Sequence, residues 1–192
     1  MIYEAAEDSY LLSGEVAKYS RGKKVLDLGT GSGIQAETAL KAGAKSVLAA
    51  DINQEVVDLV KKKKIQTVNS YLFSKIKGKF DLIIFNPPYL PEDKREDSES
   101  SLISSGGKKG DEIIVRFLER VGRYLSKKGI ILIVLSSLTP QRKILKFLKE
   151  KGFIREVISE KKIFMEKLEV WKIEKKKNKF NSYYSERLKF LT

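Results

Sequence analysis

Short apolar runs alternate along the chain with longer segments in which apolar residues recur at helical spacing. The runs are typical of strands covered on both faces, and they comprise residues 24–29, 46–51, 80–86 and 129–136. The segments between them predict helices over 33–43, 54–64, 111–126 and 140–151, with Gly43, Gly129 and Gly152 where helices should end. This order indicates an α/β fold with a mostly parallel sheet and helices on both faces.

The last part of the chain follows a different pattern. Residues 153–163 and 167–174 predict two strands joined by a turn near 164–166, which gives the parallel sheet an antiparallel C-terminal hairpin. A further strand around 67–69 has little room. We expect residues 1–174 to form one domain and 175–192, which open with a run of lysines, to form a basic C-terminal appendage.

Composition narrows the chemistry. The 192 residues are 42% hydrophobic, which suits a single domain with a substantial core. The chain has no cysteine and no histidine, so disulfides, cysteine-based zinc sites and Ser/His or Cys/His catalytic pairs are excluded. No apolar run approaches the roughly 20 residues that span a bilayer, and the first residues do not resemble a signal peptide. We therefore expect a soluble cytoplasmic protein.

Charge leaves two interpretations open. The 38 basic residues outnumber the 25 acidic ones, giving a net charge of +13, which is compatible with a transient contact with RNA or the ribosome. A lysine- and glutamate-rich chain could equally reflect a hot habitat or genome composition. Residues 92–110 form a polar stretch with five acidic side chains, which fits a solvated loop or a binding lid.

A glycine loop follows the first predicted strand. Gly29, Gly31 and Gly33 lie between that strand and a helix, where glycines let a ligand approach the backbone and free N–H groups favour an anionic or electron-rich group. Asp27 lies at the strand's end. The dinucleotide fingerprint would place its third glycine at position 34, which is Ile34, so a pyrophosphate-binding dehydrogenase is disfavoured.

Asp51 ends the second predicted strand. An acidic side chain there can accept hydrogen bonds from the two hydroxyls of a ribose. The alternative is that Asp51 caps the helix that follows, although Asn53 could do this by itself.

The sequence NPPYLP at 86–91 follows the apolar run FDLIIF. Two prolines end a strand because they lack an N–H donor, and Asn-Pro and Pro-Pro are ordinary turn signals. A simple turn therefore accounts for Asn86, Pro87 and Pro88, but gives Tyr89 no role.

The three motifs together resemble the class I methyltransferases that use S-adenosylmethionine. The resemblance implies a Rossmann-like, mostly parallel seven-stranded sheet. The NPPY form is similar to that of enzymes that methylate a planar exocyclic or amide nitrogen. These include DNA adenine methyltransferases and HemK-type protein glutamine methyltransferases.

The first residues favour the second group. YEAAEDSYLL at 3–12 resembles the opening of the short archaeal and eukaryotic HemK branch, which acts on the Gly-Gly-Gln motif of peptide chain release factors; GGKKGDEIIVRFL at 106–118 and VWKIEK at 170–175 are also similar. The resemblance implies a release factor as substrate. Some members of this branch work with a small zinc-containing activator subunit that pairs with the edge of the sheet, so the resemblance also suggests such a partner.

The resemblance also implies roles for single residues. The Asn86 Oδ1 and the Pro87 carbonyl would accept both hydrogens of the substrate amide, and Tyr89 would pack on its plane beside Pro88. Ser9 and Asp27 would contact the methionine end of the cofactor, and Leu72 its adenine. The family's adenine-binding aspartate is replaced by Tyr71, so backbone groups and stacking would have to hold the adenine.

Two other functions remain open. A nucleic-acid adenine-amino methyltransferase would use the same NPPY chemistry on a flipped base, and the basic charge favours it. A non-catalytic RNA-binding or scaffold protein would need no intact site, whereas Asp27, Asp51 and Asn86 are all present.

Overall fold

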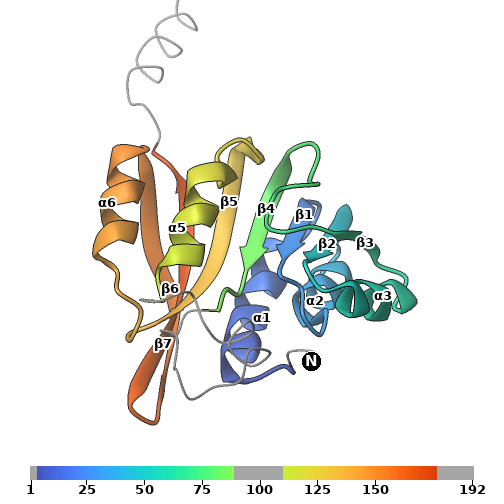
Figure 1. Ribbon diagram of the computed structural model, residues 1–192, viewed down its shortest axis with the longest axis horizontal. Coiled ribbons are helices and arrows are strands. Elements are labelled where there is room, and N and C mark those ends of the chain that lie inside the picture. The colour runs from blue at the N-terminus through green and yellow to red at the C-terminus, as the bar shows by residue number, and fades with distance from the viewer. Residues whose placement is uncertain (1–3, 89–109, 177–192) are drawn as a thin grey trace, which may run out of the picture.

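A computed structural model describes residues 4–88 and 110–176, and within them the chain forms a sheet with helices on both faces (Figure 1). The helices are α1 (Glu7–Tyr19), α2 (Ile34–Lys41), α3 (Gln54–Lys62), α5 (Glu112–Val121) and α6 (Arg142–Glu150). The strands are β1 (Lys24–Leu28), β2 (Ser46–Asp51), β3 (Gln66–Asn69), β4 (Phe80–Phe85), β5 (Leu125–Ser136), β6 (Phe153–Ile163) and β7 (Glu166–Lys175).

The seven strands lie in the order β3-β2-β1-β4-β5-β7-β6. All neighbouring pairs from β3 to β5 are parallel, and β7 runs antiparallel to both β5 and β6. The predicted fold class, including the antiparallel C-terminal hairpin, is thus confirmed. Strand order reverses between β1 and β4, and in open α/β sheets ligands bind at the carboxyl ends of the strands beside such a reversal.

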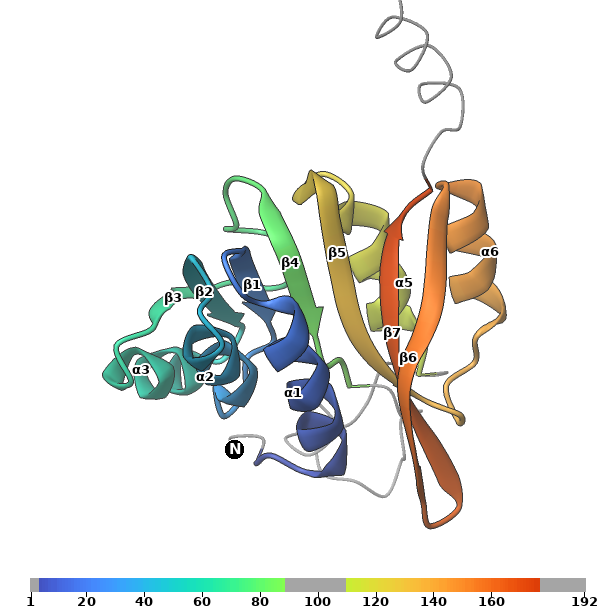
Figure 2. The same ribbon diagram turned by 180° about the vertical axis from the view of Figure 1, so that it is seen from behind.

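The core lies in two layers because strand side chains alternate between the faces of the sheet. In β4, Ile83 and Phe85 join the layer under α5 and α6, whereas Leu82 and Ile84 join the layer with α1, α2 and α3. Figure 2 shows the second set of helices in front of the sheet, with α1 lying over it near β4 and β5. Burial on both faces explains why these strands have nearly continuous apolar sequences.

Helix α1 was not predicted from the apolar pattern. Its buried positions include Leu12 and Val16, but also the polar residues Asp8, Ser9 and Glu15. A buried face that carries this many polar side chains weakens the helical period of hydrophobicity. The polar residues nevertheless lie inside for a reason, since two of them reach the candidate site.

The helix predicted over 111–126 ends earlier, at Val121, and β5 begins at Leu125. Gly129 therefore lies inside a strand and ends no helix. A Cβ at this position would be 2.9 Å from the Phe80 carbonyl oxygen, so the absence of a side chain lets β5 approach β4. Gly43 and Gly152 do follow α2 and α6 with positive φ, as predicted.

Candidate active site

Three predicted motifs meet at the carboxyl ends of adjacent strands. The glycine loop follows β1, Asp51 ends β2, and Asn86 follows β4, and these strands are neighbours in the order β2-β1-β4. Gly29, Gly31 and Gly33 all have positive φ, which other residues rarely adopt. At Gly33 a Cβ would also lie 3.0 Å from the Val60 side chain, so this glycine lets the start of α2 pack on α3.

The N–H groups of this loop are used within the protein. They donate to three acceptors: Gly29 and Thr30 to the Ala50 carbonyl (2.8 and 3.0 Å), Gly33 to the Thr30 carbonyl (2.8 Å), and Gly31 to the Asp51 carboxylate (3.1 Å). For these four groups the expectation of free N–H donors is wrong. These four donors are therefore not available to a phosphate, which would need several free N–H groups.

Asp51 spans the gap between the loop and α3. Its Oδ2 accepts from Gly31 N–H, and its Oδ1 accepts from Asn53 N–H at 3.0 Å. The cap of α3 is instead Asn53, whose side chain accepts from Glu55 N–H. The capping alternative for Asp51 is therefore wrong, and the half-buried carboxylate retains lone pairs for a further donor such as a ribose hydroxyl.

Asp27 lies deep under the loop and is 1% exposed. Its Oδ2 accepts from the Thr30 hydroxyl (2.6 Å) and from the Ala36 N–H in the first turn of α2 (3.1 Å). Burial raises the pKa of this carboxyl to about 7, and the two hydrogen bonds limit the rise. Asp27 thus has a structural role, joining β1 to α2, in addition to the predicted contact with the cofactor.

This burial predicts a pH dependence of stability. Because the folded-state pKa lies above the ordinary 3.8, the folded state binds the proton more tightly than the unfolded state. The stabilisation is complete below about pH 4 and is lost as pH rises through 7, by on the order of 4 kcal/mol. Urea unfolding of wild type and Asp27→Asn at several pH values measures this loss, because the variant cannot titrate at position 27. If the carboxyl titrates normally, the difference in free energy of unfolding between the two proteins should vary little over this pH range.

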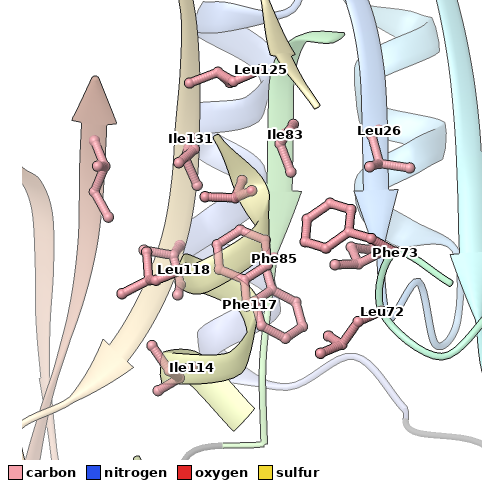
Figure 3. Packing of buried hydrophobic residues seen from close by; sticks show 14 of the residues in the cluster. Leu26, Leu72, Phe73, Ile83, Phe85, Ile114, Phe117, Leu118, Leu125 and Ile131 are labelled. Carbon is pink, nitrogen blue, oxygen red and sulfur yellow. The ribbon is translucent and has the colours of Figure 1, made fainter. Parts of the chain in front are cut away.

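Asn86 is anchored by its neighbour in sequence. Phe85 is buried, and its ring centroid lies 4.6 Å from that of Phe117 in α5. Figure 3 shows the two rings side by side. The same aromatic group includes Phe73, whose ring stacks on Tyr124 at 4.5 Å. This packing fixes the end of β4, so the backbone position of Asn86 is set by the core.

The side chain of Asn86 has one amide end bound and the other free. Its Nδ2 donates to Asp8 Oδ2 (3.3 Å) and to Ser9 Oγ (3.4 Å), both at the start of α1. Its Oδ1 is buried, and across residues 4–88 and 110–176 it is the one buried side-chain polar atom without a hydrogen-bond partner. Buried polar atoms are almost always paired in folded proteins, so this oxygen points to a missing donor.

The start of α1 is held against α2. The Gln35 side chain donates to the Ser9 carbonyl at 2.9 Å, and its oxygen accepts from the Ser13 hydroxyl at 3.1 Å. Glu7 forms an ion pair with Lys161 of β6. Of these residues only Ser9 was predicted from the sequence; Asp8 lies in the stretch YEAAEDSYLL, but nothing in the spacing of that stretch indicates a contact with Asn86, and Gln35 carries no sequence signal.

The remaining predicted residues lie as follows. Leu72 follows β3 with a φ of 46°, and its side chain is buried in the core, so its backbone is the part available to an adenine. Tyr71 is 42% exposed and its hydroxyl accepts from Arg116 at 3.1 Å. Pro87 is buried and Pro88 half-buried. Tyr89 and residues 92–109 lie outside the described residues, as do 177–192.

A ribose-type acceptor, a glycine loop and an amide oxygen awaiting a donor, on adjacent strands of this sheet, define a class I methyltransferase. The chain belongs to the Methyltransferase small domain family, which it matches over residues 7–165.

Two relatives and one solved structure narrow the similarity. A Methanocaldococcus jannaschii protein with the provisional name protein N5-glutamine methyltransferase is 41% identical over 177 residues, or 88% of this chain and 89% of the relative. Human methyltransferase HEMK2 is 30% identical over 169 residues, 79% of each chain. The Mtq2–Trm112 complex of E. cuniculi, described as responsible for methylation of the eRF1 termination factor, is 28% identical with a TM-score of 0.75 over 91% of this chain and 98% of that one.

S-adenosylmethionine is the cofactor of this class, and the site fits it. Asp51 can accept from the ribose, four N–H groups of the loop already have acceptors within the protein, and the start of α1 lies next to Asn86. In the described part of the chain, no group of three or more acidic side chains could hold a metal ion, and no helix is long and apolar enough to cross a membrane.

Proposed function

We propose that this protein transfers a methyl group from S-adenosylmethionine to the side-chain amide nitrogen of a glutamine in the Gly-Gly-Gln motif of a release factor. The observation that carries the proposal is the buried, unpaired Oδ1 of Asn86 at the end of β4. A primary amide carries two N–H donors, one of which can supply the hydrogen bond that this oxygen lacks. The names of the relatives support a glutamine and a termination factor as substrates.

The chain's own groups can position this reaction. An amide nitrogen is a weak nucleophile because its lone pair is delocalised into the carbonyl. If Asn86 Oδ1 and the Pro87 carbonyl each accept one N–H, the nitrogen is held opposite the methyl group, and charge that builds on it is stabilised. The bound cofactor supplies an electrophilic methyl group. No general base is required, because the positively charged product can lose its proton to water.

The proposal is tested by mass spectrometry of a release factor incubated with this protein and labelled cofactor. The label should appear on the glutamine of Gly-Gly-Gln, and replacing that glutamine should abolish it. DNA and RNA containing adenine are assayed in parallel, since a nucleic-acid adenine-amino methyltransferase would use the same acceptor on an exocyclic amino group. Label on nucleic acid with none on the release factor would show that the protein is a nucleic-acid methyltransferase instead.

A small partner subunit is part of the proposal. The solved Mtq2 structure contains Trm112 as its partner, and in this sheet β3 and β6 form the two edges at which another chain could pair. The release-factor assay is therefore run with and without a Trm112-type subunit. A zinc ion in that subunit and a cytoplasmic location remain our predictions.

The distribution of charge supports a contact with RNA at the end of the sheet where the parallel strands begin, opposite the site. Many exposed or half-buried lysines gather at the amino ends of the parallel strands and the adjoining ends of β6 and β7: Lys23, Lys24, Lys45, Lys77, Lys79, Lys127, Lys128, Lys151, Lys175 and Lys176. Asp81 and Glu174 lie at the same edge. A phosphate backbone is the partner that this charge fits, and it would leave the active-site edge free.

Exchange of Lys127 and Lys128 for glutamine should weaken RNA binding by about tenfold and lower its salt dependence by about two units in log–log slope. Fluorescence anisotropy with a labelled RNA at several salt concentrations measures both. The control exchanges Lys161 and Lys162, which are also exposed but lie at the carboxyl end of β6, where Lys161 pairs with Glu7. Equal losses in both pairs would indicate general charge attraction without a preferred edge.

A further inference from the structure

We propose that Asp8 is a positioning residue that fixes the orientation of the Asn86 amide, so that its oxygen faces the substrate. An asparagine amide has two ends of nearly the same size, and only one of them can accept a hydrogen bond. Catalysis by the proposed route needs the oxygen toward the substrate. Something in the protein must therefore select this orientation before the substrate binds. The inference rests on the proposed function for its kinetic test and on the contacts alone for its spectroscopic test.

The geometry assigns this selection to Asp8. Its Oδ2 lies 3.3 Å from Asn86 Nδ2. An ionised carboxylate can only accept, so it favours the amide nitrogen and would repel the amide oxygen. The second partner of Nδ2 is the Ser9 hydroxyl at 3.4 Å, which has a single hydrogen and donates it to Asp8 Oδ1, so Asp8 also makes this hydroxyl an acceptor toward Asn86.

Asp8 is itself rigidly placed. It is 5% exposed, and its Oδ1 accepts from the Ser9 N–H at 2.5 Å and the Ser9 hydroxyl at 3.2 Å. Ser9 in turn is tied to α2, because its carbonyl accepts from Gln35. A buried side chain held in this way loses little entropy when it contacts Asn86, so the selection is built in before substrate arrives.

The arrangement also explains the unpaired oxygen. With both donors of Nδ2 directed at the start of α1, Oδ1 points away from α1 and stays without a partner in the described residues. Turning the amide over would set the oxygen against the Asp8 carboxylate, and the Ser9 hydroxyl could pair with it only by giving up its hydrogen bond to Asp8. The fold thus keeps a catalytic acceptor unsatisfied, which is a cost that active sites commonly carry.

Asp8→Asn tests the proposal, because the new amide can donate to Asn86 and removes the preference. We expect kcat on the release factor to fall by about tenfold, with KM and the cofactor dissociation constant within about twofold of wild type. In an Asn86→Ala background the same exchange should have no further effect on kcat. The matched control is Glu15→Gln, another buried acid of α1 that pairs with Lys18, and it should leave kcat unchanged.

A readout independent of activity is the side-chain amide signal of Asn86 in a 15N-labelled sample, assigned by its loss in Asn86→Ala. Asp8→Asn should shift this signal and Glu15→Gln should not. An unmoved signal, or an equal kcat loss in the Asn86→Ala background, would overturn the proposal. A loss confined to cofactor affinity would make Asp8 a cofactor-binding residue instead. Absence of wild-type methylation of the release factor would count against the proposed function, while the signal would still decide the contact.

Discussion

Asn86→Ala should retain cofactor binding but lower methyl transfer to the release-factor glutamine by about two to three orders of magnitude. This is the size of effect expected when a preorganised acceptor of a transition-state charge is removed. The side chain projects from the end of β4, and its backbone is fixed by the packing of Phe85 against Phe117. The exchange therefore removes the acceptor without disturbing the strand. Single-turnover rates with saturating cofactor measure the chemical step directly.

Two comparisons make this result specific. The cofactor affinity of the variant should match that of wild type, and its melting temperature should fall only modestly, because the exchange removes the unpaired Oδ1 together with the two long hydrogen bonds of Nδ2 to Asp8 and Ser9. Asn86→Asp keeps an acceptor but places a negative charge beside Asp8, and it should also be slow. If Asn86→Ala transfers methyl groups within about threefold of the wild-type rate, Asn86 is not the acceptor and β4 simply ends in a turn.

Much of the fold could be predicted because burial on both faces of a parallel sheet leaves a strong sequence signal. The runs at 24–29, 46–51 and 80–86 correspond to β1, β2 and β4, and the motifs at their ends meet as expected. The signal failed where the local pattern was overridden by tertiary contacts. Gly129 lacks a side chain because two strands approach each other there, but in the sequence alone a glycine at this position resembles the end of a helix.

The site was predicted less completely, because its contacts join residues far apart in the chain. Local motifs indicated Asp51 and Asn86, since each lies directly after an apolar run. The partner of Asn86 is Asp8, 78 residues earlier, on a helix whose polar buried face concealed it. Likewise the use of the loop N–H groups by Ala50 and Asp51 depends on the register of β1 and β2.

Asp51→Ala should weaken S-adenosylmethionine binding by about 1.5–3 kcal/mol, the range for hydrogen bonds to a charged acceptor. The carboxylate ends β2 and already orders the neighbouring backbone through Gly31 and Asn53. Asp51 lies at the carboxyl end of β2, where ligands of this fold bind, and its carboxylate retains lone pairs for a further donor. Titration calorimetry measures the loss, which amounts to about 10- to 150-fold in the dissociation constant.

The control for this effect is Asn53→Ala. It removes the cap of α3, which should cost about 0.5–2 kcal/mol of folding stability, but it leaves the carboxylate in place. Its cofactor affinity should stay within about twofold of wild type, because stability and binding are separable when the acceptor itself is intact. If both variants weaken binding equally, the loss comes from disorder at the start of α3, and Asp51 has no ribose role. If neither weakens it, the cofactor is held by other groups at this edge.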